Sequence, residues 1–109
     1  MSKMVSVVVK NVLADKDVLD EARKLLAKYG VENTKNGFMV GEFGEVIVAV
    51  ENGLVKVHYD EFYSSSRILA EKVTDALIAA TVAKSARLMG ARIVNIRETA
   101  EGYEIEGWA

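Results

Sequence analysis

The sequence predicts an α+β fold in which two βαββ units form one mostly antiparallel, six-stranded sheet with two helices on one face. Three observations carry this prediction. An alternating apolar run followed by an amphipathic helix occurs twice, each helix ends at a glycine (Gly30 and Gly90), and a glycine followed by an aromatic residue opens a later strand in each half. We therefore expect a single domain over 1–109, with a pseudo-repeat of 4–51 and 54–108.

The first half opens with a strand and an amphipathic helix. Val5–Val9 alternates between the two faces of a strand. A helix is predicted over Val18–Tyr29, with Asp15 or Asp17 as its N-cap and Gly30 as its stop. Two further strands are then expected, over Phe38–Gly41 and Glu45–Glu51.

A tight turn at Asn52-Gly53 joins the two halves. This dipeptide favours a two-residue type I′ hairpin, which fixes the pairing of the flanking strands. The expected partners are Glu51 with Leu54, Val50 with Val55, Val48 with Val57, and Val46 with Tyr59. One face of this hairpin is then all apolar and belongs to the core, and the other carries Ile47, Ala49, Lys56, His58 and Asp60.

The second helix is predicted over Ile68–Met89, with Ser64–Ser66 as its cap. Its sheet-facing side consists of apolar and mostly small residues, namely Leu69, Ala70, Val73, Ala76, Leu77, Ala80 and Ala83. Two last strands follow, over Arg92–Glu98 and Tyr103–Trp108, with Val94, Ile96, Tyr103 and Ile105 directed to the core. These strands complete the expected six-stranded sheet.

Composition narrows the classes of function. The chain has 109 residues, no cysteine, one histidine and a net charge of −2. Disulfides, zinc–thiolate sites and cysteine nucleophiles are excluded, and we expect neither a metal nor a cofactor. Nucleic-acid binding is disfavoured because phosphate contacts require a basic face. The N-terminus lacks the pattern of a signal peptide and no apolar run is long enough to cross a membrane, so a cytoplasmic protein is expected.

Glutamine is absent, whereas charged residues and valine are frequent. Such a composition is typical of thermophile proteins.

One cluster could carry chemistry at the start of the second helix. Ser64, Ser65, Ser66 and Arg67 could bind an anion or another small molecule there, with His58 nearby. Serine is also the ordinary N-cap residue, and capping is the simpler interpretation. A serine nucleophile with His58 as its base is the least favoured reading. His58 itself reads as a surface histidine on a strand, because no second histidine exists to complete a metal site.

Apolar residues on the predicted outer surfaces point to association. Ile78, Val82 and Met89 fall on the side of the second helix that faces away from the sheet. Met39, Ile47 and Ile93 are assigned to the open face of the sheet. Since several apolar residues on one exposed side indicate a contact surface, these six are our candidate interface residues.

The chain resembles a family of uncharacterised proteins, the hypothetical chloroplast reading frame of algal plastids and cyanobacteria, with bacterial relatives. The resemblance rests on "NVLADKDVLDEARKLLAKYGV" near the start, the Tyr59-Asp60 step, and "EKVTDALIAATVAKSARLMGARIV" before the Gly-aromatic final strand. The family's usual His-Phe near the N-terminus is Lys3-Met4 here. The family has no established catalytic residues. Some bacterial relatives are thought to be encoded beside AAA-type ATPases, which implies an accessory or adaptor role.

These observations favour binding over catalysis. The first expectation is a non-catalytic protein-interaction or adaptor module that self-associates, with an AAA-type ATPase as the partner that the resemblance implies. The alternative is a small-molecule or anion-binding protein, including a weak enzyme, that uses the start of the second helix. RNA binding ranks third. Alternation along the strands directs Phe38, Tyr59 and Tyr103 to the core, so the open sheet face has none of these aromatic side chains for stacking on bases.

Overall fold

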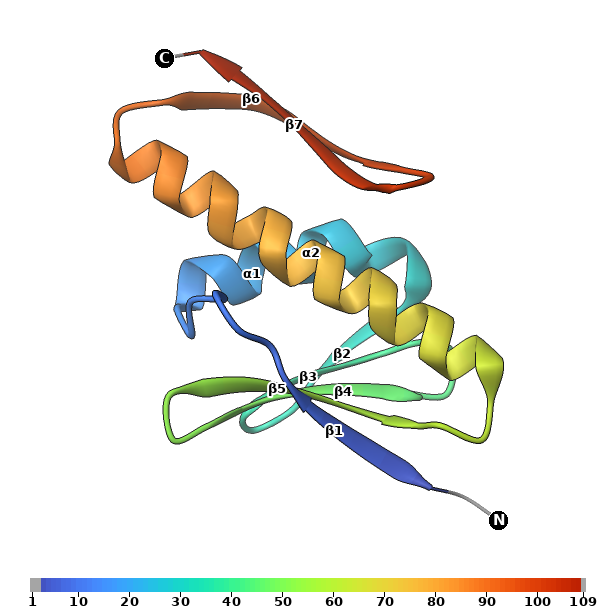
Figure 1. The fold of residues 1–109 in the computed structure, drawn as a ribbon. Coiled ribbons are helices and arrows are strands. Elements are labelled where there is room, and N and C mark those ends of the chain that lie inside the picture. Colours follow the sequence, from blue (N-terminus) through green and yellow to red (C-terminus); the bar gives the residue numbers. More distant parts are fainter. Residues whose placement is uncertain (1–2, 109) are drawn as a thin grey trace.

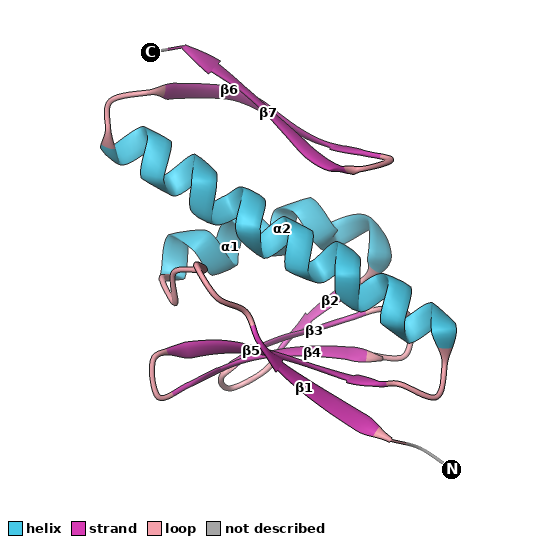
Figure 2. Ribbon diagram, in the orientation of Figure 1, coloured by secondary structure: helices cyan, strands magenta, loops and turns pink. Residues whose placement is uncertain are grey.

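The protein has three layers, with two helices packed between a five-stranded sheet and a two-stranded hairpin (Figures 1 and 2). The computed structural model describes residues 3–108, so Met1 and Ser2, on which the expected lack of a signal peptide partly rests, lie outside the described residues. The elements in chain order are β1 (Met4–Val8), α1 (Lys16–Leu26), the 3-10 turn η1 (Ala27–Tyr29), β2 (Val31–Asn33), β3 (Gly37–Val40), β4 (Val46–Glu51), β5 (Leu54–Asp60), α2 (Ser64–Leu88), β6 (Arg92–Thr99) and β7 (Gly102–Trp108).

The larger sheet is antiparallel throughout, in the order β1-β5-β4-β3-β2. The predicted hairpin register is confirmed at all four positions, from Glu51 with Leu54 to Val46 with Tyr59. Asn52 and Gly53 have positive φ angles of 52° and 77°, as a type I′ turn requires. Because this register directs alternate valines of β4 and β5 to the helices, the core contains Val46, Val48, Val55 and Val57, all fully buried.

The prediction of one six-stranded sheet made of two βαββ units is wrong, although the α+β class holds. In the described part of the chain, strands β6 and β7 pair with each other and with no other strand. They pack on the side of α2 that faces away from the larger sheet (Figure 1). The first half also contains β2, a short strand that was not predicted. The physical reason lies in α2, which is apolar on two sides and so supports one sheet on each.

Helix α1 begins at Lys16, two residues before the predicted start, and ends at Leu26, with Ala27–Tyr29 in 3-10 form. Asp15, one of the two predicted N-cap candidates, accepts a hydrogen bond of 2.7 Å from the Asp17 N–H. Helix α2 begins earlier than predicted, at Ser64, with Tyr63 in the N-cap position and no capping side chain. The expected serine cap is therefore wrong, because the three serines already lie within the first turn. The predicted sheet-facing side of α2 is confirmed for Ala70, Val73, Ala76, Leu77, Ala80 and Ala83, which are all buried.

A register shift in β6 reverses two assignments. The shift lies between Ile93 and Asn95 and inserts one extra residue, Val94, into the ladder. Val94 was expected in the core but is 48% exposed. Ile93 was expected on the open face of the large sheet but lies half-buried in the separate hairpin, opposite Gly107.

Candidate interaction surfaces

The open face of the large sheet, which no helix covers, holds two of the predicted interface residues. The pairing aligns Ser6, His58, Ile47 and Met39 in one row across four strands. Ile47 and Met39 are half-buried, and Ser6 Oγ lies 2.5 Å from His58 Nδ1. This row is mixed in polarity and flat, and its histidine is engaged with a neighbouring strand.

The residues of the predicted anion site do not come together. Strand parity places His58 on the open face, whereas Tyr59, its neighbour, lines a groove on the helix side with Arg67. Ser66 is buried, with only 3% of its surface exposed. Ser64, Ser65 and Arg67 are exposed in the first turn of α2, without the histidine that the predicted site included. Within residues 3–108, no group of three or more histidine, aspartate or glutamate side chains is arranged to hold a metal ion.

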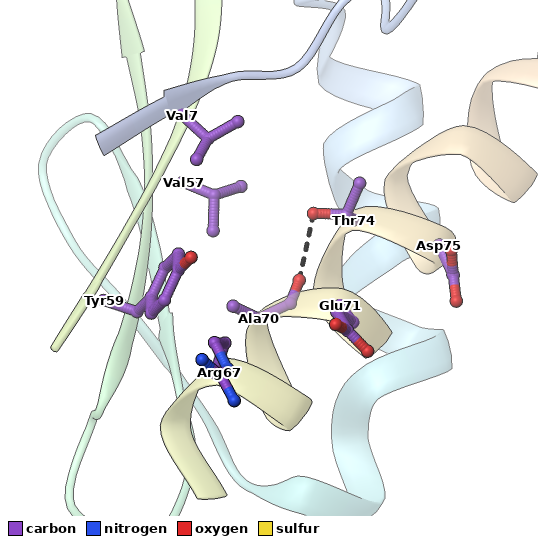
Figure 3. A pocket seen from close by; sticks show the side chains of 8 residues that line it. All are labelled: Val7, Val57, Tyr59, Arg67, Ala70, Glu71, Thr74 and Asp75. Atoms are coloured by element: carbon purple, nitrogen blue, oxygen red, sulfur yellow. Dashed lines mark hydrogen bonds between the residues drawn. The ribbon is translucent and has the colours of Figure 1, made fainter. Parts of the chain in front are cut away.

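A groove of about 300 Å³ runs between the β1 edge of the sheet and the first half of α2 (Figure 3). We call it the sheet-edge groove, and its lining is Val7, Val57, Tyr59, Arg67, Ala70, Glu71, Thr74 and Asp75. Its floor is apolar and its helix side is charged. It exists because neither helix lies over β1, which leaves Val7 43% exposed on the helix side of the sheet.

The charged side chains of this groove have no ion-pair partners in the described part of the chain. Arg67 and Glu71 lie one helical turn apart on α2, and both are exposed. Neither forms an ion pair with any residue between 3 and 108, and the same holds for Asp75. Burial is the main cause that raises the pKa of the Asp75 carboxyl.

The second half of α2 and its C-cap residue, Met89, expose apolar side chains. Ile78, Val82 and Met89, which we call the α2 strip, are 42%, 49% and 88% exposed. A second groove, of about 350 Å³, lies between this part of α2 and β7. Its lining includes Ile78, Ala79, Val82, Tyr103 and Ile105. The three residues that the helical wheel placed on the outer side are thus all exposed, and two of them line a groove.

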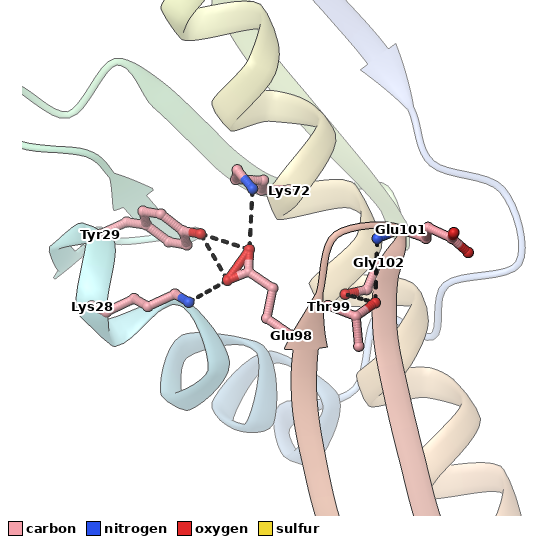
Figure 4. Close-up of polar contacts among 7 residues, drawn as sticks. All are labelled: Lys28, Tyr29, Lys72, Glu98, Thr99, Glu101 and Gly102. Carbon is pink, nitrogen blue, oxygen red and sulfur yellow. Dashed lines mark hydrogen bonds and ion pairs between the residues drawn. The ribbon is translucent and has the colours of Figure 1, made fainter.

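A partly buried carboxylate attaches the hairpin to the helices (Figure 4). Glu98 of β6 accepts hydrogen bonds from the Tyr29 hydroxyl at 2.6 and 2.8 Å, and it pairs with Lys72 at 3.2 Å and with Lys28. The hydrogen bond from Lys28 is the largest cause that lowers the pKa of Glu98, to about 2. We call these four residues the Glu98 clamp. It ties β6 to both η1 and α2.

Tyr103 lies beside the clamp with its hydroxyl buried and without a hydrogen-bond partner in the described structure. Burial, with a smaller effect of Glu98, raises the pKa of its phenol to about 12. Glu98 was not among the predicted site residues, and Tyr103 was predicted only as a core residue. The signal was present, since Glu98 has the same parity as Ile96 and faces Tyr103 across the hairpin.

Comparison with known proteins identifies no relative, since no family model, no curated protein and no solved structure matches this chain. The resemblance to the chloroplast reading-frame family and the AAA-type ATPase partner therefore stay predictions. In the described part of the chain, neither helix is both long and apolar enough to cross a lipid bilayer.

Proposed function

We propose that this protein is a non-catalytic interaction module that associates with copies of itself through the α2 strip. The observation that carries the proposal is the composition of α2. Its second half packs against α1 on one side, where Lys84 and Arg87 pair with Asp17 and Glu21, and against the hairpin on another. Its remaining side still exposes Ile78 and Val82. Exposed apolar patches on small proteins commonly mark contact surfaces.

The geometry favours binding over catalysis. The groove beside the α2 strip is lined by aliphatic side chains and one tyrosine, together with two acidic residues, Asp75 and Glu101. This lining provides apolar surface for a partner to contact, and it contains no pair of a nucleophile and a base within hydrogen-bonding distance of each other. The anion-binding alternative loses support, because its proposed histidine and arginine lie on opposite faces of the sheet.

The test is the molar mass of the Ile78→Glu/Val82→Glu variant, measured by light scattering after size-exclusion chromatography. We expect wild-type protein to exceed the mass of one chain and the variant to lose at least half of that mass, because two buried carboxylates per copy would oppose the contact. Circular dichroism should show that the fold survives, since both positions are exposed in the single chain.

Ile68→Glu is the matched control. Ile68 is an exposed isoleucine on the same helix, outside the strip. It should keep the wild-type mass. A wild-type protein that stays a single chain at high concentration would contradict the proposal, as would a double variant with unchanged mass.

A further inference from the structure

Among residues 3–108, strand β1 is an edge of the large sheet, and no described strand pairs with its outer side. The Val9 N–H donates to the Val55 carbonyl at 2.9 Å, and the Glu61 N–H donates to the Lys3 carbonyl at 2.8 Å. Since hydrogen-bonding direction alternates along an antiparallel strand, Val5 and Val7 also point their backbone groups at β5. The N–H and C=O groups of Met4, Ser6 and Val8 therefore point away from the sheet.

This edge lacks the devices that usually prevent strand addition. Exposed edges are commonly protected by a charged residue, a proline, a bulge or a covering helix. Met4–Val8 has no charged residue and no proline, pairs with β5 in continuous register, and has neither helix packed over it. The edge is thus open to another strand along its full length.

We propose that β1 pairs antiparallel with β1 of a second copy, about a twofold axis beside Ser6. In this register Ser6 faces Ser6 of the other copy, Val5 faces Val7, and Met4 faces Val8. Every outward-pointing N–H of β1 then meets an outward-pointing C=O of the second copy. The two sheets become one continuous sheet of ten strands, twice the five observed in one chain.

The chain is complementary to itself in this arrangement. On both sides of Ser6 an apolar side chain meets another apolar side chain, and the register sets Lys3 opposite Val9 instead of another lysine. The sheet-edge groove lies directly beside the pairing strand, and its Arg67 and Glu71 have no partners within the described chain. A twofold axis through the joined strands runs the two copies of α2 antiparallel on the same side of the joined sheet.

This inference deepens the proposed function, on which it rests for self-association, but it uses a different surface from the α2 strip. One symmetric contact makes a dimer, whereas two different symmetric contacts on one chain make a larger assembly. We therefore expect wild-type protein to assemble beyond a dimer.

Charge substitutions at Ser6 test both the contact and its register. The Ser6 side chain is exposed, and its hydrogen-bonding contact in the structure is with His58. Ser6→Lys or Ser6→Glu alone should halve the mass of the assembly, because like charges then face each other across the axis. An equimolar mixture of the two variants should regain the wild-type mass at low salt. Ser6→Ala removes the hydroxyl without adding charge and should keep the wild-type mass.

The outcomes separate this proposal from the previous one. Unchanged mass in Ser6→Lys overturns the edge contact, and a mixture that fails to regain mass overturns the register. Mass lost in Ser6→Lys but not in Ile78→Glu/Val82→Glu supports the edge contact and removes the α2 strip as an interface. The reverse pattern overturns the edge contact alone. A wild-type protein that is a single chain overturns both proposals and leaves the edge to a strand of some other protein.

Discussion

The two sides of α2 are held by different kinds of interaction. Toward the large sheet, α2 buries Val73, Ala76 and Leu77 completely in a continuous apolar core. Toward the hairpin, its contacts are with half-buried Ile96, Ile105 and Tyr103, and the attachment is completed by the Glu98 clamp. The difference suggests a hierarchy of stability, since regions with little buried apolar area open locally before the rest of a protein unfolds. We expect the hairpin to open before the sheet.

The largest effect should come from the core side of this comparison. Leu77 is fully buried, so Leu77→Ala removes apolar contacts and leaves a cavity that the packed sheet cannot close. We expect the free energy of unfolding to fall by about 2–5 kcal/mol. Urea denaturation measures it. A loss below about 1 kcal/mol would show that this side is packed no better than the other.

An intermediate effect should come from the clamp. Glu98→Gln removes a carboxylate that accepts hydrogen bonds from Tyr29 and from two lysines. We expect a loss on the order of 2 kcal/mol, allowing for solvent screening of the exposed lysines. Hydrogen exchange should accelerate in β6 and β7 more than in β4 and β5. Glu104→Gln, on the outer face of the same hairpin, is the control and should have little effect.

The same clamp predicts a pH dependence. The pKa of Glu98 is lowered from 4.5 to about 2 in the folded protein, so the unfolded chain binds its proton more readily. The stability that this carboxylate contributes is therefore complete above its unfolded pKa and is lost as the pH falls from about 5 toward 2. Urea titrations across this range should show a steeper decline for wild type than for Glu98→Gln. Parallel declines would contradict the assignment.

The smallest effect should come from an apolar contact of the hairpin. Ile105 is half-buried against α2, so Ile105→Ala should cost about 1 kcal/mol, less than a fully buried residue. Val94→Ala, at an exposed position of the same hairpin, should be nearly neutral. If Ile105→Ala lowered the free energy of unfolding as much as Leu77→Ala, the two sides of α2 would be packed equally well.

The local structure could largely be predicted from the sequence, because it depends on neighbours in the chain. Asn52-Gly53 set the register of β4 and β5, and the spacing of alanines and leucines identified the sheet-facing side of α2. The partner of the last hairpin could not be predicted in the same way. Alternation in β6 and β7 indicates that one face is apolar, but it does not say whether that face joins a sheet or packs on a helix.

The candidate surfaces were predicted in part for the same reason. Ile78, Val82 and Met89 follow from helical spacing and are exposed. The open edge of β1 depends on which strands end up beside it, which is set by residues far away in the chain. The bulge at Val94 shifts the pairing register between Ile93 and Asn95 by one residue. The alternation of apolar residues in β6 does not predict this bulge.

The position of the hairpin after α2 also has a consequence for synthesis. The large sheet, α1 and α2 are complete in the chain before Arg92–Trp108 has been translated. Until then the outer side of α2 is without its cover, and the lysines and tyrosine of the clamp lack their carboxylate. A nascent chain at this stage displays a folded sheet beneath a bare apolar helix, which is the form most exposed to chaperones and to premature association with neighbouring chains.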